Sequence, residues 1–167
     1  MLFKMDKLIG IKHKIVTYDQ LDRLLAFWHF RDFKIVFTNG CFDILHLGHV
    51  EYLSRAASYG DILIIGLNSD KSVKSIKGPS RPVQDEITRA SVLASLQFVD
   101  KVVLFDEDTP YKLIKRIQPD VLVKGADYKP EDIVGYDIVK SKSGEIITIE
   151  YVEGQSTTGI INKLKHL

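Results

Sequence analysis

Two histidines three residues apart carry the strongest chemical signal in the chain. His46 and His49 enclose Leu47 and Gly48, after an apolar run and before residues with helical spacing. At this spacing both rings lie on one face of a helix. The start of a helix attracts anions, imidazoles there can donate to phosphate oxygens, and Gly48 lets a ligand approach the backbone. The pattern favours phosphate binding over capping or surface histidines, and no nearby Cys or third His completes a zinc site.

The run from Gly154 to Thr158 is a second phosphate signal, because it precedes the last predicted helix. Ser156, Thr157 and Thr158 supply hydroxyl and amide donors that suit a triphosphate tail. Simple N-capping by Ser156 or Thr157 is the alternative. Capping is compatible with phosphate binding, and the histidine motif favours the latter.

The segment from Lys77 to Pro82 is rich in glycine and proline and holds two cations, Lys77 and Arg81. Such a loop can act as a mobile flap that brings positive charge over a developing anion. A solvated surface loop explains the same composition equally well.

The elements that must position these groups alternate between short apolar runs and amphipathic stretches. Thr17 and Gln20 have capping-box spacing at the start of the first helix, whose Phe27, Trp28 and Phe30 are predicted to be core. Thr109 and Pro110 are predicted as N-cap and first residue of another helix. The predicted strands are 34–38, 61–67, 101–105, 120–123 and 145–150, and the predicted helices are 17–30, 49–58, 85–96, 109–117 and 156–164.

Strands that are apolar throughout belong in a parallel sheet covered on both faces. The sequence therefore predicts an α/β fold, a Rossmann-like doubly wound parallel sheet of about five strands in three αβα layers. Ligands of such sheets bind beyond the carboxyl ends of the strands. The candidate site residues at and after the carboxyl ends of the predicted strands are Thr38, Asn39, Gly40, Cys41, Phe42, Asp43, Asn68, Asp70, Lys124, Gly125 and Asp127.

Composition narrows the class of protein. The chain has 167 residues, a formal net charge of +1 and one cysteine, Cys41. These values predict one globular domain without a disulfide, and they lack the positive excess of a nucleic-acid binder. We expect no membrane span, no signal peptide and a cytoplasmic protein. We expect residues 1–33 to form an N-terminal extension and helix packed on a domain of residues 34–167. P-loop, dinucleotide-binding and nucleophile-elbow motifs are absent from the sequence.

The run from Thr38 to Asp43, leading into His46–His49, resembles the signature of the cytidylyltransferase-like nucleotidyltransferases. Within them, the chain resembles the D-glycero-β-D-manno-heptose 1-phosphate adenylyltransferases from about residue 34 to 164. With no sugar-kinase half in the sequence, it is similar to their stand-alone form. The further matching motifs are 68–70, 77–78 with 81–83, 107–110, 124–128 and 156–158.

The resemblance implies that ATP and heptose 1-phosphate give ADP-heptose and pyrophosphate, for lipopolysaccharide or another surface glycan. It also implies strand order 3-2-1-4-5, a homodimer, and Mg²⁺ held mainly by the triphosphate with no metal site in the protein. His46, His49 and Lys77 are then the catalytic residues, and Lys77 and Arg81 bind the sugar phosphate. The implied nucleotide-binding residues are Thr38, Asn39, Gly40, Cys41, Phe42, Asp43, Gly48, Asn68, Asp70, Arg89, Lys124, Gly125, Asp127, Ser156, Thr157 and Thr158.

Several alternatives stay open at this point. Asp43 caps a turn or orients a histidine or Mg²⁺, and Arg89 pairs with a phosphate or with Asp43, although a charge on a helix is more often at the surface. A CTP-dependent enzyme acting on glycerol 3-phosphate or phosphoethanolamine is the nearest rival function. A nucleotide-sensing module without catalysis is the rival of another class.

Overall fold

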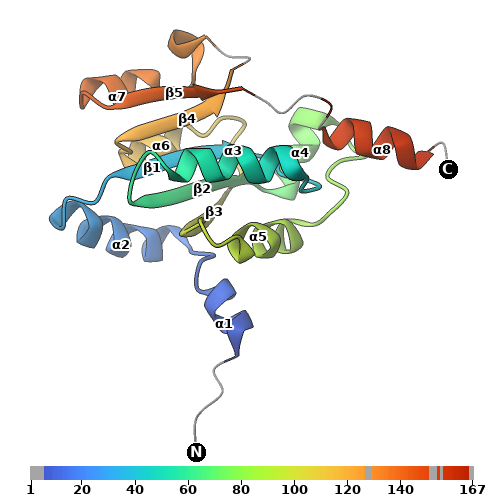
Figure 1. The fold of residues 1–167 in the computed structure, drawn as a ribbon, viewed down its shortest axis with the longest axis horizontal. Coiled ribbons are helices and arrows are strands. Elements are labelled where there is room, and N and C mark those ends of the chain that lie inside the picture. The colour runs from blue at the N-terminus through green and yellow to red at the C-terminus, as the bar shows by residue number, and fades with distance from the viewer. Residues whose placement is uncertain (1–5, 127–128, 151–153, 155, 166–167) are drawn as a thin grey trace, which may run out of the picture.

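The computed structural model describes residues 6–126, 129–150, 154 and 156–165. Five strands form one sheet in the order β3-β2-β1-β4-β5, and every neighbouring pair is parallel (Figure 1). This confirms the predicted fold class and strand order. The strands are β1 Ile35–Gly40, β2 Ile62–Asn68, β3 Lys101–Phe105, β4 Val121–Gly125 and β5 Glu145–Ile149.

Helices connect the strands and cover the sheet. Thr17 caps α2 and Gln20 completes the capping box, as predicted. Pro110, not Thr109, is the N-cap of α6, because the first bond of that helix runs from the Ile114 amide to the Pro110 carbonyl at 2.9 Å. The helices are α1 Lys7–Lys12, α2 Tyr18–Phe30, α3 Leu47–Ala57, α4 Asp70–Lys77, α5 Glu86–Ser95, α6 Tyr111–Ile117, α7 Tyr136–Ser141 and α8 Thr157–Lys165, with the 3₁₀ turn η1 Pro130–Asp132.

Each face of the sheet has its own core, since alternate strand residues point to opposite sides. Ile35 and Phe37 of β1 pack with α2, α6 and α7, whereas Val36 packs with α3 and α5. Trp28 of α2 joins the first core as predicted. Phe27 and Phe30 do not: 53% and 83% of their surface is exposed, because they lie off the helix face that meets the sheet.

Carboxylates at the amino ends of the strands fix the alignment of the sheet. The side chain of Asp120 accepts a hydrogen bond from the Ile35 amide at 2.8 Å, and Asp100 accepts one from Leu63 at 2.8 Å. Asp61 accepts from the Lys34 amide at 2.8 Å. Each bond joins an amide near the start of one strand to the carboxylate just before a neighbouring strand. These three amide donors are therefore satisfied within the protein.

The segment before α2 covers the open edge of β3. The Val16 amide donates to the Val102 carbonyl at 3.0 Å, and the Val102 amide donates to Lys14 at 2.8 Å. An exposed edge strand can pair with other chains, so this short pairing protects the sheet. It gives residues 14–16 a structural role, while the predicted division of the chain at residue 33 stays a prediction. Among the described residues, no helix is long and apolar enough to cross a membrane.

Candidate functional site

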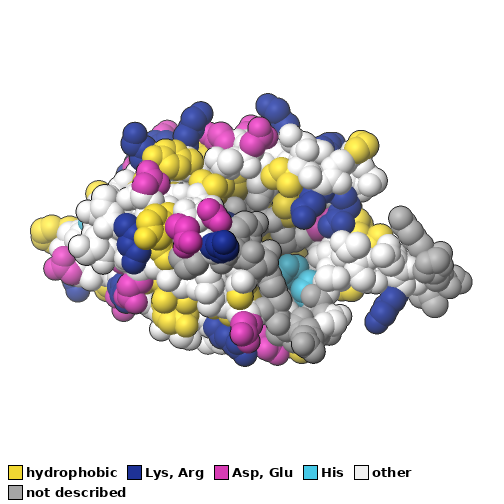
Figure 2. Space-filling view, turned by 90° about the horizontal axis from the view of Figure 1, so that it is seen from above, with side chains coloured by type: hydrophobic (Ala, Val, Ile, Leu, Met, Phe, Trp, Pro, Cys, Tyr) yellow, Lys and Arg dark blue, Asp and Glu magenta, His cyan; other side chains and the backbone are white. Residues whose placement is uncertain are grey.

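A pocket of about 520 Å³ opens at the carboxyl ends of the strands, where the sequence predicts the site. Figure 2 shows histidine side chains inside a hollow on this face, with cationic side chains beside it. The predicted residues that line the pocket are Asn39, Gly40, Cys41, Phe42, Asp43, His49, Asn68, Lys77, Arg81, Lys124, Gly125 and Thr157. Tyr52 and Asp132 also line the pocket and were not singled out in the sequence, while Asp108 and Thr109 line it from the matching motif 107–110, for which no site role was predicted.

The two histidines stack on each other at the start of α3. His46 is the N-cap of the helix without a side-chain capping bond, and its ring lies 3.9 Å from that of His49 between centroids. Phe42 contacts His49 edge-on at 5.3 Å. The Nδ1 atoms of both histidines are buried and have no hydrogen-bond partner among the described residues. Buried polar atoms are usually paired, so two such atoms in one place indicate a site for a ligand.

Burial also sets the charge of these rings. It lowers the pKa of His46, and it lowers the pKa of His49 to about 4. The neighbouring His46 lowers the pKa of His49 further, and a hydrogen bond with the Ile44 backbone only partly opposes this shift. Both imidazoles are therefore neutral near pH 7, and each has one N–H donor and one acceptor nitrogen. A bound anion beside the rings would favour their protonated form and raise both pKa values.

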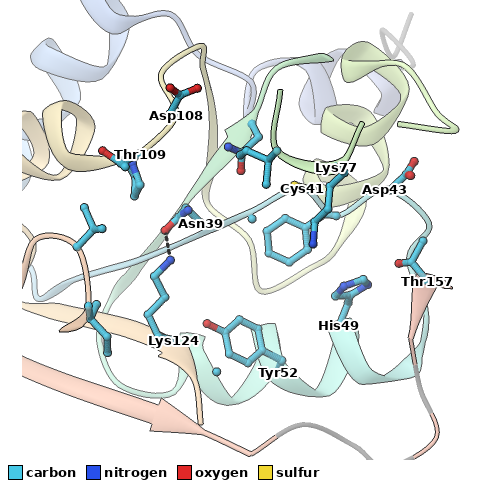
Figure 3. A pocket seen from close by; sticks show the side chains of 18 of the residues that line it. Asn39, Cys41, Asp43, His49, Tyr52, Lys77, Asp108, Thr109, Lys124 and Thr157 are labelled. Atoms are coloured by element: carbon cyan, nitrogen blue, oxygen red, sulfur yellow. Dashed lines mark hydrogen bonds between the residues drawn. The ribbon is translucent and has the colours of Figure 1, made fainter. Parts of the chain in front are cut away.

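Lys77 enters the pocket from the opposite side. It is the last residue of α4, so the predicted loop begins one residue later, at Gly78, whose φ of 92° ends the helix. In Figure 3 the Lys77 side chain points toward the part of the pocket that holds His49. The fold thus brings together one cation from β2–α4 and one histidine from β1–α3.

The loop after Lys77 is tied to the end of β1 by Asp43. This buried carboxylate accepts hydrogen bonds from Arg81 Nε at 2.7 Å and from the amides of Val83 and Gln84 at 2.8 and 3.0 Å. Burial alone would raise the pKa of Asp43, but the bonds from Gln84, Val83 and Arg81 outweigh it and hold the pKa below its usual value. Asp43 is thus an ionised anchor of this loop.

Arg89 is buried, with 1% of its surface exposed. Its guanidinium donates to the carbonyls of Cys41 at 2.6 Å and Asn68 at 2.8 Å, and to the Asp70 carboxylate at 2.7 Å. It therefore pairs with Asp70 and not with Asp43, and it is not a surface charge. Through these bonds Arg89 holds the ends of β1 and β2 and the start of α4 in one arrangement.

Thr38 and Gly48 are buried and do not line the pocket, whereas Asn68 lines it with a side chain that is already bonded within the protein. The Thr38 hydroxyl bonds to the Tyr52 hydroxyl at 2.8 Å, and the Asn68 side chain donates to Ser72 at 2.9 Å. Gly48 is buried in the first turn of α3. These contacts give Thr38 and Asn68 a clear structural role, and their binding roles stay predictions.

The far end of the pocket lies between β1, β4 and the loop after β3. Lys124 donates to the Asn39 side chain there, at the point where the strand order reverses (Figure 3). Asp108 and Thr109 face the same space from above α6. This end therefore offers carboxylate and hydroxyl groups as well as an ammonium group.

The start of α8 reaches the histidine end of the pocket. Thr157 lines it and donates its hydroxyl to the Ile44 carbonyl at 3.4 Å. Ser156 accepts from the Gly159 amide at 3.0 Å, so it does act as a helix cap. Thr158 is exposed, and Asp127 lies outside the described residues. Phosphate binding by this segment stays a prediction.

Comparison with known proteins identifies the family of this chain. A family model described as cytidylyltransferase-like matches residues 37–163. The "Bifunctional protein HldE" of Campylobacter concisus (strain 13826) is 56% identical over 156 residues, which cover 93% of this chain and 32% of that protein. The protein of the same name from Geobacter metallireducens is 54% identical over 161 residues, with 93% and 33% covered. The chain thus spans about a third of the length of these curated relatives.

Two solved structures share the fold. The lipopolysaccharide core biosynthesis protein from Thermoplasma volcanium GSS1 is 25% identical with a TM-score of 0.58, over 74% of this chain and 99% of that one. The pantoate-beta-alanine ligase from Francisella tularensis, complexed with beta-gamma ATP and beta-alanine, is 18% identical with a TM-score of 0.59, over 92% of this chain and 78% of that one. The second likeness concerns the fold alone.

Proposed function

The chain belongs to the cytidylyltransferase-like family, and on that premise we propose that it is a nucleotidyltransferase. In this proposal it transfers the adenylyl group of ATP to D-glycero-β-D-manno-heptose 1-phosphate, and the products are ADP-heptose and pyrophosphate. The product would serve the synthesis of lipopolysaccharide or another surface glycan.

One observation carries the proposal. The pair His46/His49 starts α3 at the carboxyl edge of the sheet, and its Nδ1 atoms are buried without a partner among the described residues. His49 lines a pocket that Lys77 enters from the other side. Neutral imidazoles, helix amides and an ammonium group are the donors that a transferring phosphoryl group requires.

The choice of substrates rests on the resemblance and on the relatives. Relatives at 50% identity or more over nearly the whole chain carry the name HldE. The solved structure at 25% identity is that of a lipopolysaccharide core biosynthesis protein. The pocket of about 520 Å³ is within the range of small-ligand sites.

The reaction requires no protein nucleophile. An oxygen of the acceptor phosphate attacks the α-phosphorus in line, its bond to phosphorus forms, and the bond between the α-phosphorus and the bridging oxygen breaks. The electron pair leaves with pyrophosphate. His46, His49 and Lys77 stabilise the charge on the α-phosphate, and Ser156, Thr157 and Thr158 bind the β,γ tail. Gly40, Cys41 and Phe42 border the nucleotide through their backbone, and Lys124, Gly125 and Asp127 line its base and ribose.

Mg²⁺ fits this scheme as part of the nucleotide substrate. Among the described residues, no group of three His, Cys, Asp or Glu side chains converges as a ligand set. Mg²⁺ commonly keeps several waters and binds through substrate phosphates. When bound to the triphosphate, it neutralises charge on the leaving pyrophosphate.

The remaining proposals come from the resemblance and from the sequence pattern. They are that the chain works as a homodimer in the cytoplasm, with residues 34–167 as the nucleotidyltransferase domain. Light scattering of the purified chain tests the first: a mass of two chains supports it, and a mass near 19.0 kDa contradicts it.

A substrate matrix tests the function. Pyrophosphate release with Mg²⁺ is measured for ATP, CTP, GTP and UTP, each with heptose 1-phosphate, glycerol 3-phosphate and phosphoethanolamine. We expect release with ATP and heptose 1-phosphate. Release only with another pair would keep the mechanism and replace the substrates, and nucleotide binding without any release would favour a sensing module.

A further inference from the structure

Arg81 is fixed at one of its nitrogens and open at the other two. Its Nε donates to Asp43 at 2.7 Å, its side chain is 18% exposed, and it lines the pocket. Its two terminal nitrogens make no hydrogen bond to any residue in the described part of the chain. A guanidinium held in this way can still offer a pair of parallel N–H donors, the arrangement that matches two phosphate oxygens.

Asp43 holds Arg81 in this position. Its side chain is 1% exposed, and both of its oxygens accept hydrogen bonds, one from Arg81 and the other from the amides of Val83 and Gln84. A carboxylate occupied in this way would repel a phosphate if it faced one directly. It acts instead by compensating the positive charge of Arg81 and by holding its side chain in one rotamer.

The pocket has to hold two phosphorylated substrates, and its cationic and donor groups lie on two walls. His49 and Thr157 come from α3 and α8, whereas Lys77 and Arg81 come from the end of α4 and the loop behind it. A triphosphate bound along the first wall leaves the second wall for another phosphate. Arg81 lies on that second wall, four residues beyond Lys77.

We propose that Asp43 is a positioning residue for the acceptor: it fixes the guanidinium of Arg81, whose terminal nitrogens hold the phosphate of the sugar phosphate. The proposal rests on the proposed function, because it concerns the second substrate of that reaction. An interaction kept from the bound state through the transition state changes KM and leaves kcat almost unchanged. The acceptor KM is therefore the quantity that responds.

The first test compares R81A, R81K and D43N with the wild-type chain. A hydrogen bond to a charged group contributes about 1.5–3 kcal/mol, so R81A should raise the KM for the sugar phosphate about 10- to 100-fold. The KM for ATP should change less than about 3-fold. R81K keeps the charge but loses the fork, and it should resemble R81A. D43N should raise the same KM about 10-fold.

D22N is the matched control. Asp22 pairs with Arg116 through two bonds of 2.7 Å on the outer surface of α2 and α6. The D22N substitution removes a carboxylate from an Arg–Asp pair that does not line the pocket. The KM values for ATP and for the sugar phosphate should therefore stay at wild-type level. A purely structural role of Asp43 would lower the melting temperature and raise both KM values together.

Chemical rescue tests the coupling of the two residues. Methylguanidinium added to R81A should lower the KM for the sugar phosphate, because Asp43 remains to orient it. It should have no effect in the double variant R81A/D43N. If D43N does not fold, the comparison of R81A with R81K decides, because a lysine that restores the KM shows that charge without a fixed fork suffices.

The outcomes distinguish failure of the positioning role from failure of the proposed function on which it rests. Absence of turnover in the wild-type chain with every substrate pair overturns the proposed function and this proposal with it. An active wild-type chain with an unchanged acceptor KM in R81A, or with full activity in R81K, overturns the positioning role alone. A selective rise in the acceptor KM in R81A, R81K and D43N, with rescue only where Asp43 is present, supports it.

Discussion

The polar groups at the two ends of the sheet differ in how completely they are hydrogen-bonded within the protein. At the amino end, Asp100 and Asp120 accept bonds from strand amides, and Lys34 pairs with Glu145 at 2.8 Å. At the carboxyl end, His46 and His49 bury Nδ1 atoms without a partner among the described residues. The polar groups at the amino end stabilise the fold, whereas the carboxyl end contains buried nitrogen atoms with which a ligand could form hydrogen bonds.

The carboxyl end is itself built in two layers. The inner layer consists of Arg89 and Asp43, two buried side chains that are satisfied by partners from several elements. In the outer layer, His49 and Lys77 line the pocket, and His46 stacks on the ring of His49. Unsatisfied groups can keep one geometry only where the groups behind them are fixed, so the inner layer determines the precision of the outer one.

The largest expected effect concerns the inner layer. Arg89→Met should lower the free energy of unfolding by about 3–5 kcal/mol, because it leaves Asp70 and the three carbonyls of Cys41, Asn68 and Gln84 without their buried partner. Urea denaturation followed by circular dichroism measures it. Arg116→Gln, at an exposed ion pair, should cost less than about 1 kcal/mol and serves as the control. Equal effects in the two variants would contradict the layered arrangement.

The next effect concerns the outer layer. His49→Ala should reduce turnover about 10²–10³-fold, since it removes one donor from the transferring phosphoryl group, and the fold should remain intact. Steady-state pyrophosphate release and a melting curve measure the two properties. His29→Ala, at the amino end of the sheet, should leave turnover unchanged. Near-normal turnover in His49→Ala would refute its assignment.

The amino end should show the opposite pattern. Asp120→Ala leaves the Ile35 amide without its acceptor and should cost about 1–3 kcal/mol of stability. Turnover at a temperature where the variant is folded should stay within about 2-fold of wild type, since Asp120 is not among the residues that line the pocket. A loss of turnover larger than the loss of folded protein would show that the two ends are coupled.

The smallest expected effect is a dependence of stability on pH. Burial lowers the pKa of His49 to about 4 in the folded chain, below the ordinary histidine pKa of about 6.5. The unfolded chain therefore binds more protons between these values, and stability falls as the pH drops from 6.5 toward 4. After allowance for solvent screening, the loss is about 1–2 kcal/mol. Urea denaturation of wild type and His49→Gln at four pH values measures it, and identical slopes would contradict the burial of this ring.

The fold was largely predictable because its signals are local. The strand Lys101–Phe105 agrees with the prediction residue for residue, and the capping box of Thr17 and Gln20 marks the start of α2. The helix α4 escaped prediction because, of its apolar residues, Val73 is buried and Ile76 is exposed, so it carries no apolar stripe. Phe27 and Phe30 were wrongly predicted as core, since composition does not say which face of α2 meets the sheet.

The histidine pair was predictable for the same reason: its spacing places both rings at one helix start. The pairing of Asp43 with Arg81 was not, because the partners lie 38 residues apart and depend on the path of a loop. Arg89 did carry a signal, as it lies four residues before the buried Leu93 on the inner face of α5. Tyr52 follows His49 by three residues, and the same helical spacing could have identified it as a lining residue.

The central claim is that the carboxyl end of the sheet binds two phosphorylated substrates and joins them. Phosphorus NMR of the wild-type chain with Mg²⁺, ATP and heptose 1-phosphate tests it most directly. The account predicts that pyrophosphate and the diphosphate signals of a nucleotide sugar appear in equal amounts, while the signals of both substrates decline. Formation of ADP with inorganic phosphate, or unchanged spectra, would contradict it.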